Sequence, residues 1–423
     1  MEEQSSSTNP QRSFTRKKRK LTIETEPLTL TLIPVHTHTS KHKQKQGRRN
    51  SENRKWVYST RDCSNHKDKF VFLSYNILGV ENASKHKDLY INVLPKFLKW
   101  KHRLRVIRKE IARYNPSILC FQEVDRFDDL NTTLQKDGFK GVYQARTGEA
   151  RDGCGIFWKD EMFSLVHEDN IEFKHFGLRD NVAQFCVLKM NGCQTHVDDT
   201  ENLKTLTQPS GSRSILVGNI HVLFNPSRGD IKLGQVRLFL AKAHRLLETW
   251  GNIPVILGGD FNSMPQSAMY QFIASSELNI QHHERKKICG QIFPLNYPTF
   301  QCHSNYYSSR WNKEELRLAT GTKHSTYLRH KLKLNSAYHG VPATRLTRDE
   351  YGEPLATSFH SRFMGTVDYI WHTGDLVPLK VLETLPIETL EKTEGLPSKR
   401  WGSDHLALVC EFAVADADDL SGI

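Results

Sequence analysis

Short apolar runs that end in polar side chains recur along this chain. They span residues 70–76, 117–124, 214–221, 255–263, 365–371 and 401–409. The runs lack the alternating polar positions that would turn one face to water, so they predict buried strands. Several strand ends therefore carry carboxylate, amide or imidazole groups. A soluble domain rarely places that many polar groups at strand ends unless they converge.

Two amphipathic helices are expected between these strands. Residues 100–112 form the first, with an apolar stripe of Leu104, Ile107 and Ile111. Residues 231–250 form the second, with Leu233, Val236, Leu240, Ala243 and Leu247 on its inner face. Because helices alternate with strands that have no water-facing side, the pattern predicts an α/β fold with both sheet faces covered.

The chain is expected to hold one large domain. Its 423 residues contain no mid-chain linker and no internal repeat, so we expect a folded domain at 68–413, a basic disordered tail at 1–67 and a short tail at 414–423. Residues 191–213 are rich in small polar residues, which predicts an exposed excursion. Residues 302–358 show few strand signals, which predicts long loops with one short helix.

Positive charge is concentrated in the N-terminal tail. Residues 1–60 hold 13 Lys/Arg and 5 Asp/Glu, a net of +8 out of +12 for the whole chain. Arg16–Lys20 is a compact basic cluster, and Lys41–Arg49 is a looser one. Such clusters are typical of nuclear addresses and of patches that bind a phosphate backbone. They are equally typical of a solvated disordered tail. On the first interpretation we expect the protein in the nucleus and the cytoplasm.

Membrane and secreted classes are disfavoured by the pattern. The longest apolar runs are far too short to span a bilayer, and the N-terminus lacks the charged-then-apolar order of a secretory signal. The eight cysteines occur singly, without a C-x-x-C pair. We therefore expect reduced structural thiols, no zinc site, no disulfide framework and no membrane partner.

Residues 255–263 carry the clearest candidate chemistry. Gly258 and Gly259 are expected to let the chain bend at the strand end, after which Asp260 and Asn262 project the same way. The carboxylate can hold a water or a cation, and the neutral amide can donate to a phosphate oxygen. An ordinary Asx turn explains this segment alone equally well. The other strand ends add Asn76, Glu123, His221, Asp368 and His405. Jointly these groups favour a catalytic site.

In chain order, the motifs resemble the endonuclease/exonuclease/phosphatase superfamily of metal-dependent phosphodiesterases. They read Ser-Tyr-Asn, Gln-Glu-Val, Gly-Asp-Phe-Asn, Val-Asp-Tyr-Ile and Ser-Asp-His, and residues 152–154 and 232–235 add further matches. Within the superfamily, the chain is most similar to the nuclease domains of the carbon catabolite repressor protein 4 (deadenylase) and Angel group. The resemblance covers about residues 68–413. It implies a DNase I-like four-layer α/β sandwich of two packed mixed sheets, with the site at one end.

The resemblance also implies a metal-dependent mechanism. Glu123 would be the principal metal ligand, and Asn76 would orient it or the phosphate. Asp260 would position and deprotonate the attacking water, and Asn262 would hold a phosphate oxygen. The same resemblance allows a second cation near Asp260, Asn262 and His405. Hard carboxylate and amide oxygens favour Mg²⁺ or Mn²⁺ over zinc.

The two histidines would act on the scissile phosphate. By resemblance, His405 would stabilise the charge that builds on the phosphorane, with Asp368 or Asp404 fixing its tautomer. His221 would be another donor. Each group also has a structural interpretation: Glu123 could cap the following helix, the histidines could be satisfied buried residues, and Asp368 could belong to a turn.

The substrate is the least determined part of the prediction. Phe363 and Pro226 occupy positions where deadenylases of the family sandwich the terminal adenine, which favours a 3'-to-5' exoribonuclease that shortens poly(A) and releases AMP. Residues 327–330 and 359–362 instead resemble the Angel branch, associated with removing 2',3'-cyclic phosphate from RNA ends. Phe363 could also be plain core packing. A DNA endonuclease, a phosphoinositide phosphatase and a non-catalytic RNA-binding module remain as alternatives.

RNA, through its poly(A) 3' end, is the expected partner. The large deadenylases carry leucine-rich repeats for docking to the deadenylation complex. No repeat of that kind exists here, so the chain resembles a short form and membership of that complex is doubtful.

Overall fold

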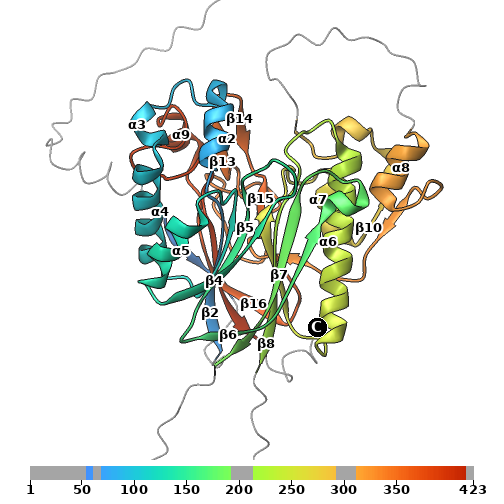
Figure 1. Cartoon of the computed structure of the whole chain (residues 1–423), viewed down its shortest axis with the longest axis horizontal. Helices are drawn as coiled ribbons and strands as arrows, with labels where there is room; N and C mark the ends of the chain where they lie inside the picture. Colours follow the sequence, from blue (N-terminus) through green and yellow to red (C-terminus); the bar gives the residue numbers. More distant parts are fainter. Residues whose placement is uncertain (1–53, 61–67, 192–212, 292–310, 416–423) are drawn as a thin grey trace, which may run out of the picture. The chain divides into compact units, whose positions relative to one another are not determined.

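The computed structural model describes residues 54–60, 68–191, 213–291 and 311–415, and two large sheets dominate this part of the chain (Figure 1). The seven-stranded sheet has the order β1-β16-β17-β2-β3-β5-β4. Its strands are β1 Trp56–Tyr58, β16 Leu376–Leu382, β17 Leu408–Val414, β2 Lys69–Asn76, β3 Ile118–Gln122, β5 Gly153–Lys159 and β4 Phe139–Ala145. The six-stranded sheet has the order β12-β15-β9-β8-β7-β6. Its strands are β12 Asn335–Ser336, β15 Asp368–His372, β9 Val255–Asp260, β8 Ser214–His221, β7 Val182–Met190 and β6 Phe163–Glu172.

Both large sheets are mixed. β2 pairs in parallel with β3, and β8 pairs in parallel with β9, whereas their other neighbours are antiparallel. The carboxyl ends of parallel neighbours meet at the same edge of a sheet. The residues that end β2 and β3, and those that end β8 and β9, are therefore brought together in pairs.

The inner faces of the two sheets pack against each other. Phe72 and Ile118 from the seven-stranded sheet share one buried cluster with Val217, Ile256 and Ile370 from the six-stranded sheet. Burial of these side chains on both sheets gives the face-to-face packing expected of a sandwich.

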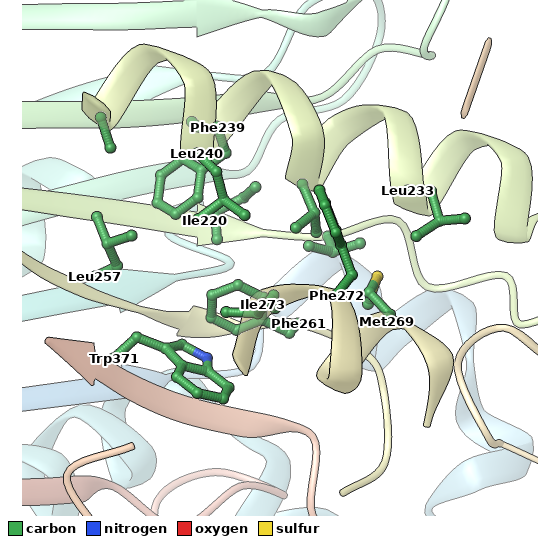
Figure 2. Close-up of a cluster of buried hydrophobic side chains, with 14 of the residues drawn as sticks. Ile220, Leu233, Phe239, Leu240, Leu257, Phe261, Met269, Phe272, Ile273 and Trp371 are labelled. Atoms are coloured by element: carbon green, nitrogen blue, oxygen red, sulfur yellow. The ribbon is translucent and has the colours of Figure 1, made fainter. Parts of the chain in front are cut away.

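Helices cover the two outer faces. Over the six-stranded sheet lie α6 Gly229–Thr249 and α7 Ala268–Ser275; in Figure 2, Phe239 and Leu240 of α6 stand above Ile220 and Leu257 of the sheet. Over the seven-stranded sheet lie α4 Trp100–Tyr114 and α5 Phe127–Gln135, through the cluster that joins Ile107 to Phe121. The predicted four-layer α/β sandwich is confirmed.

The predicted helices begin and end close to the observed ones. α4 continues two residues past the predicted end at 112 and stops at Asn115, a left-handed residue with φ 47° that precedes a proline. The short helix expected among the loops of 302–358 is α8 Lys313–Thr320, whose N-terminus is fixed by a capping box between Asn312 and Glu315. Short strands also occur there, including β11 Tyr327–Arg329, which pairs with β10 Glu277–Asn279.

Gly258 and Gly259 lie inside β9, so the predicted bend at these glycines is wrong. Both take part in the ladder with β15. A Cβ atom on Gly258 would stand 3.0 Å from the Phe72 ring of the facing sheet, and one on Gly259 would clash with the carbonyl oxygen of Ile220. The two glycines are needed because other groups approach the backbone closely.

The folded domain begins before residue 68. β1 pairs with the outer edge of β16, although it lies inside the range 1–67 that the sequence predicts as a tail. The buried Arg54 guanidinium donates to the carbonyl oxygens of Glu383, Leu382 and Ala407. A strand of three residues is too short to give a periodic signal, which explains the misplaced boundary.

The remaining elements are short. They are α2 Val80–Lys85, α3 Pro95–Leu98, α9 Ile387–Glu391, the hairpin of β13 Ser358–His360 and β14 Phe363–Gly365, and the 3₁₀ turns Lys87–Leu89, Phe173–Phe176, Ile280–His282 and Arg285–Lys287. None of the described helices is long and apolar enough to cross a membrane. The five cysteines within the described ranges are free thiols: Cys120, Cys154, Cys186, Cys289 and Cys410. The basic clusters, most of the 191–213 excursion and most of the C-terminal tail lie outside the described residues.

Candidate active site

The polar strand ends meet in one pocket of about 190 Å³. In the six-stranded sheet, Asp260 is in register with His221 on one neighbouring strand and with Asp368 on the other. Asn76 closes β2, and Glu123 directly follows β3. The pocket is lined by five of the predicted catalytic or metal residues, namely Glu123, His221, Asp260, Asn262 and His405. Asn76 and Asp368 are buried behind them.

Asn76 holds two carboxylates in place. Its side-chain amide nitrogen donates to Glu123 Oε1 and to Asp260 Oδ2, at 3.0 Å each. Its amide oxygen accepts the backbone N–H of Leu78 at 3.0 Å. One fully buried amide thus ties the seven-stranded sheet to the six-stranded sheet and orients Glu123, one of the two roles the sequence left open for it.

Glu123 is fixed by three donors. Besides Asn76, the backbone N–H of Gly79 and the side-chain amide of Asn82 donate to its Oε2, at 2.9 and 2.7 Å. Its backbone has φ 57°, a left-handed conformation that non-glycine residues seldom adopt. Glu123 does not cap the following helix, because α5 begins after Arg126 without a side-chain cap. The three hydrogen bonds aim the carboxylate into the pocket.

Asp260 and Asn262 form the Asx turn and also belong to the site. Asp260 Oδ1 accepts the backbone N–H of Asn262 at 2.8 Å, while Oδ2 accepts from Asn76. The Asn262 side-chain nitrogen donates to the Val222 carbonyl oxygen at 2.9 Å, which leaves its second hydrogen for another acceptor. The buried Lys232 ammonium donates to the Asn262 carbonyl oxygen, and burial lowers the pKa of this lysine to about 8.

Asp368 is the partner of His405. His405 Nδ1 lies 2.9 Å from Asp368 Oδ2, so the Nδ1 hydrogen is assigned to this bond and Nε2 faces Asp260 Oδ2 at 3.8 Å. Asp404 instead accepts a hydrogen bond from Tyr90 at 2.9 Å. Burial raises the pKa of Asp368. Burial opposes the charged form of His405, but the charge of Asp368 and the hydrogen bond to it raise the pKa of His405 well above its usual range.

His221 stands on the other side of Asp260. Its Nε2 lies 3.5 Å from Asp260 Oδ2, and its carbonyl oxygen accepts the Asn181 amide at 2.6 Å. Asn181 also donates to Gln235 Oε1, and the Gln235 amide donates to the Leu178 carbonyl oxygen. These contacts give the 232–235 motif a structural role, since its glutamine braces the strand end that carries His221.

The donor set fits a hard divalent cation. Asp260, Asp368 and His405 each offer a ligand atom, and these atoms lie within 4.8 Å of one another. A cation inside this triad would compete for the 2.9 Å bond between Asp368 and His405. Glu123 lies outside the triad and faces the pocket; its Oε2 accepts two hydrogen bonds, but its Oε1 accepts only that of Asn76 and keeps a free lone pair. A cation held by Glu123 leaves the hydrogen bond between His405 and Asp368 intact, so this position is the better fit.

Phe363 and Pro226 are not brought together as predicted. Phe363 lines the pocket and lies beside His360, with ring centroids 6.0 Å apart. Pro226 does not contribute to the lining, and its carbonyl oxygen faces the Cys289 thiol at 3.6 Å. The loop after β8 instead offers Phe224, whose ring lies 6.5 Å from that of His86. Phe224 lines the pocket on this loop, and the role of Pro226 at the base stays a prediction.

Several lining residues were missed in the sequence. They include Asn82, His86, Tyr90, Arg146, Asn181, Phe224 and His360. Arg146 and His360 had a usable signal, because Arg146 directly follows the strand β4 and His360 ends the strand β13 within the 359–362 motif. The Arg146 guanidinium donates to the Asp180 carbonyl oxygen and forms a salt bridge with Asp152 at 3.2 Å, which fixes its position at the rim. The others come from loops and short helices, whose place at the pocket depends on the whole fold.

Comparison with known proteins agrees with this geometry. Residues 73–405 match the model of the Endonuclease/Exonuclease/phosphatase family. The chain belongs to this family. It is 56% identical over 372 residues to carbon catabolite repressor protein 4 homolog 5 of Arabidopsis thaliana, an alignment that covers 86% of this chain and 81% of the relative. Homolog 3 from the same plant is 47% identical, with 85% and 78% covered.

Among solved structures, the fold is similar to that of ANGEL2, a 2',3'-cyclic phosphatase, in complex with adenosine-2',3'-vanadate. The TM-score is 0.68 at 29% identity, and the match covers 86% of this chain and 99% of the other. The chain is therefore a nuclease or phosphatase of the carbon catabolite repressor 4 and Angel type.

Proposed function

We propose that this protein is a metal-dependent hydrolase of RNA 3' ends, and that it shortens poly(A) in the 3'-to-5' direction with release of AMP. The observation that carries the proposal is the pocket wall. Phe363 and Phe224 line the same pocket as Glu123 and Asp260, so a base can lie against an aromatic ring while its phosphate faces the carboxylates. Aromatic side chains bind the unstacked bases of single strands in this way.

We assign the cation to Glu123 and propose Mg²⁺, with Mn²⁺ as a substitute. The cation supplies charge stabilisation at the phosphate oxygens. Asp260 Oδ2 accepts a proton from the attacking water, and the free hydrogen of the Asn262 amide donates to a phosphate oxygen. His405, held protonated beside Asp368, stabilises the negative charge that develops during the displacement. His221 adds a second imidazole near Asp260.

A second candidate is removal of a 2',3'-cyclic phosphate from an RNA end. The observation in its favour is the likeness to ANGEL2, whose structure holds adenosine-2',3'-vanadate. Both reactions place a phosphate beside a terminal nucleoside. They differ in whether a neighbouring nucleotide must leave.

Two RNAs with a 5' label separate the candidates. One ends in an oligo(A) run with a free 3' hydroxyl, and the other ends in a 2',3'-cyclic phosphate. With Mg²⁺, a ladder of shortened products on the first RNA supports the lead proposal. Loss of the cyclic phosphate without shortening would support the second candidate and contradict the first. Inactivity on both RNAs would contradict both candidates.

A further inference from the structure

A second hollow of about 280 Å³ lies on the outer side of α4, away from the pocket residues. Five exposed cations surround it: Arg105, Lys109 and Arg113 from α4, and Lys399 and Arg400 from the loop before β17. Its floor is formed by Glu110, Tyr114 and Trp401, all of them buried. We call this hollow the basic groove. We propose that it binds the phosphate backbone of single-stranded RNA whose 3' end occupies the active site.

The cations of the groove are regularly spaced. Arg105, Lys109 and Arg113 are four residues apart, so they project from one face of the helix at steps of about 6 Å along its axis. Evenly spaced positive charge suits a polyanion whose own charges repeat along a chain. Lys399 and Arg400 line the same hollow, so its positive charge comes from two segments of the chain and not from one helix face alone.

Within the described part of the chain, no salt bridge involves Arg105, Lys109 or Arg113, whereas Arg108 on the adjoining face pairs with Asp137 at 2.9 Å. The Arg105 guanidinium lies 3.3 Å from the ring nitrogen of His102 on its own helix. The single acid of the groove, Glu110, is turned inward and accepts a hydrogen bond from Tyr75 at 3.1 Å. The groove therefore presents a surplus of positive charge to an incoming anion.

Two segments connect the elements that line the groove to those that line the active site. Arg103 of α4 donates to the carbonyl oxygens of Ile77 and Leu78, and Leu78 lines the catalytic pocket. The groove loop runs from Lys399 into Ser403, whose hydroxyl donates to the Asn76 carbonyl oxygen at 2.7 Å. In Figure 1, α4 extends away from α2 and α3 along the outer side of the seven-stranded sheet. The proposal therefore has the RNA strand leave the pocket beside α2 and follow α4 to the row of cations.

An RNA backbone suits this groove better than an acidic protein does. This choice rests on the proposed function, in which one RNA strand reaches both the active site and the basic groove. The test uses the full chain and compares wild type with the variant Arg105→Gln, Lys109→Gln, Arg113→Gln. A matched control removes three exposed lysines from the region that follows α8: Lys323→Gln, Lys331→Gln, Lys333→Gln. The basic N-terminal tail is common to all three proteins, so its contribution cancels.

Binding is measured by fluorescence anisotropy in a metal chelator, over a series of salt concentrations, with oligo(A) of 20 and of 3 nucleotides. For the longer RNA, the slope of log affinity against log salt should fall by about 2 in the groove variant, since each phosphate contact on a single strand contributes about 0.7. The trimer reaches only the pocket and should bind all three proteins alike. The control variant should match wild type.

Three outcomes would overturn the proposal. They are an unchanged slope for the longer RNA, an equal loss for both RNAs, and loss of binding to an acidic polyglutamate chain while RNA binding stays intact. Because binding is read without turnover, a protein that hydrolyses no RNA would contradict the proposed function and leave the groove result standing on its own.

Discussion

The floor of the pocket and its wall are built differently. Asn76 and Asp260 on the floor are 0% and 2% exposed and are fixed by several hydrogen bonds each, at the ends of strands. Phe224 on the wall is 45% exposed and comes from a loop. Strand ends are positioned by the sheet ladders, whereas loops can change without disturbing the core. The reaction is therefore fixed by the sandwich, and the substrate is chosen by parts that vary independently of it.

Breaking the floor should have the largest effect. Glu123→Ala removes the carboxylate to which we assign the cation and should lower kcat by about a thousandfold or more on either RNA substrate. The measurement is initial rate at saturating RNA and Mg²⁺. Circular dichroism and thermal unfolding should show a folded protein. Activity near that of wild type would refute the assignment of the site.

Breaking the pair formed by His405 and Asp368 should have the second-largest effect on kcat. Asp368→Asn keeps the shape of the side chain but removes the charge that orients His405 and holds it protonated, so kcat should fall roughly 100-fold. Asp404→Asn is the comparison: its carboxylate accepts from Tyr90 and its charge also helps to raise the pKa of His405, but Asp368 holds the Nδ1 hydrogen bond, so the loss in kcat should be smaller than for Asp368→Asn. Steady-state kinetics of both variants give the comparison. An equal loss in the two would mean that Asp368 has no special role.

Substitutions in the wall should have smaller effects, and these effects should appear in substrate binding. Phe224→Ala removes an aromatic face of the pocket, so KM for oligo(A) should rise about tenfold with kcat nearly unchanged. Pro226→Ala should have little effect, since Pro226 is outside the lining. Kinetics on RNAs ending in A or in U would show whether the wall distinguishes bases. A larger effect at Pro226 than at Phe224 would restore the arrangement expected from the sequence.

The difference between the strand ends of the floor and the loops of the wall also explains which residues could be predicted from the sequence. The apolar runs located the strands and their polar ends, because burial and a short strand length leave a direct pattern. Phe224 left no such pattern, since a loop residue reaches the pocket only through contacts distant in sequence. Gly258 was assigned to a bend, although it is required by the Phe72 ring of the other sheet. β1 was missed because three residues carry no period.

A buried acid outside the pocket shows that burial alone does not mark a catalytic group. Glu353 accepts a hydrogen bond from Tyr270 at 2.7 Å, and burial raises its pKa, as it does for Asp368, yet it lies in the core. When an acid has a higher pKa in the folded protein than in the unfolded chain, its protonated form adds to the free energy of unfolding at pH values below the unfolded pKa. This contribution is lost as pH rises through the folded pKa.

Glu353→Gln should remove this pH-dependent loss of stability. The amide oxygen can still accept the hydrogen bond from Tyr270, but the side chain cannot become charged. Relative to wild type, the variant should gain stability with rising pH, by up to about 1.4 kcal/mol for each unit by which the folded pKa exceeds its ordinary value. Urea unfolding from pH 4 to pH 9 measures the difference in the free energy of unfolding. A constant difference across this range would mean that Glu353 does not change its charge on unfolding. Its turnover of oligo(A) at neutral pH should equal that of wild type, in contrast to Asp368→Asn, because only Asp368 contacts a histidine of the pocket floor.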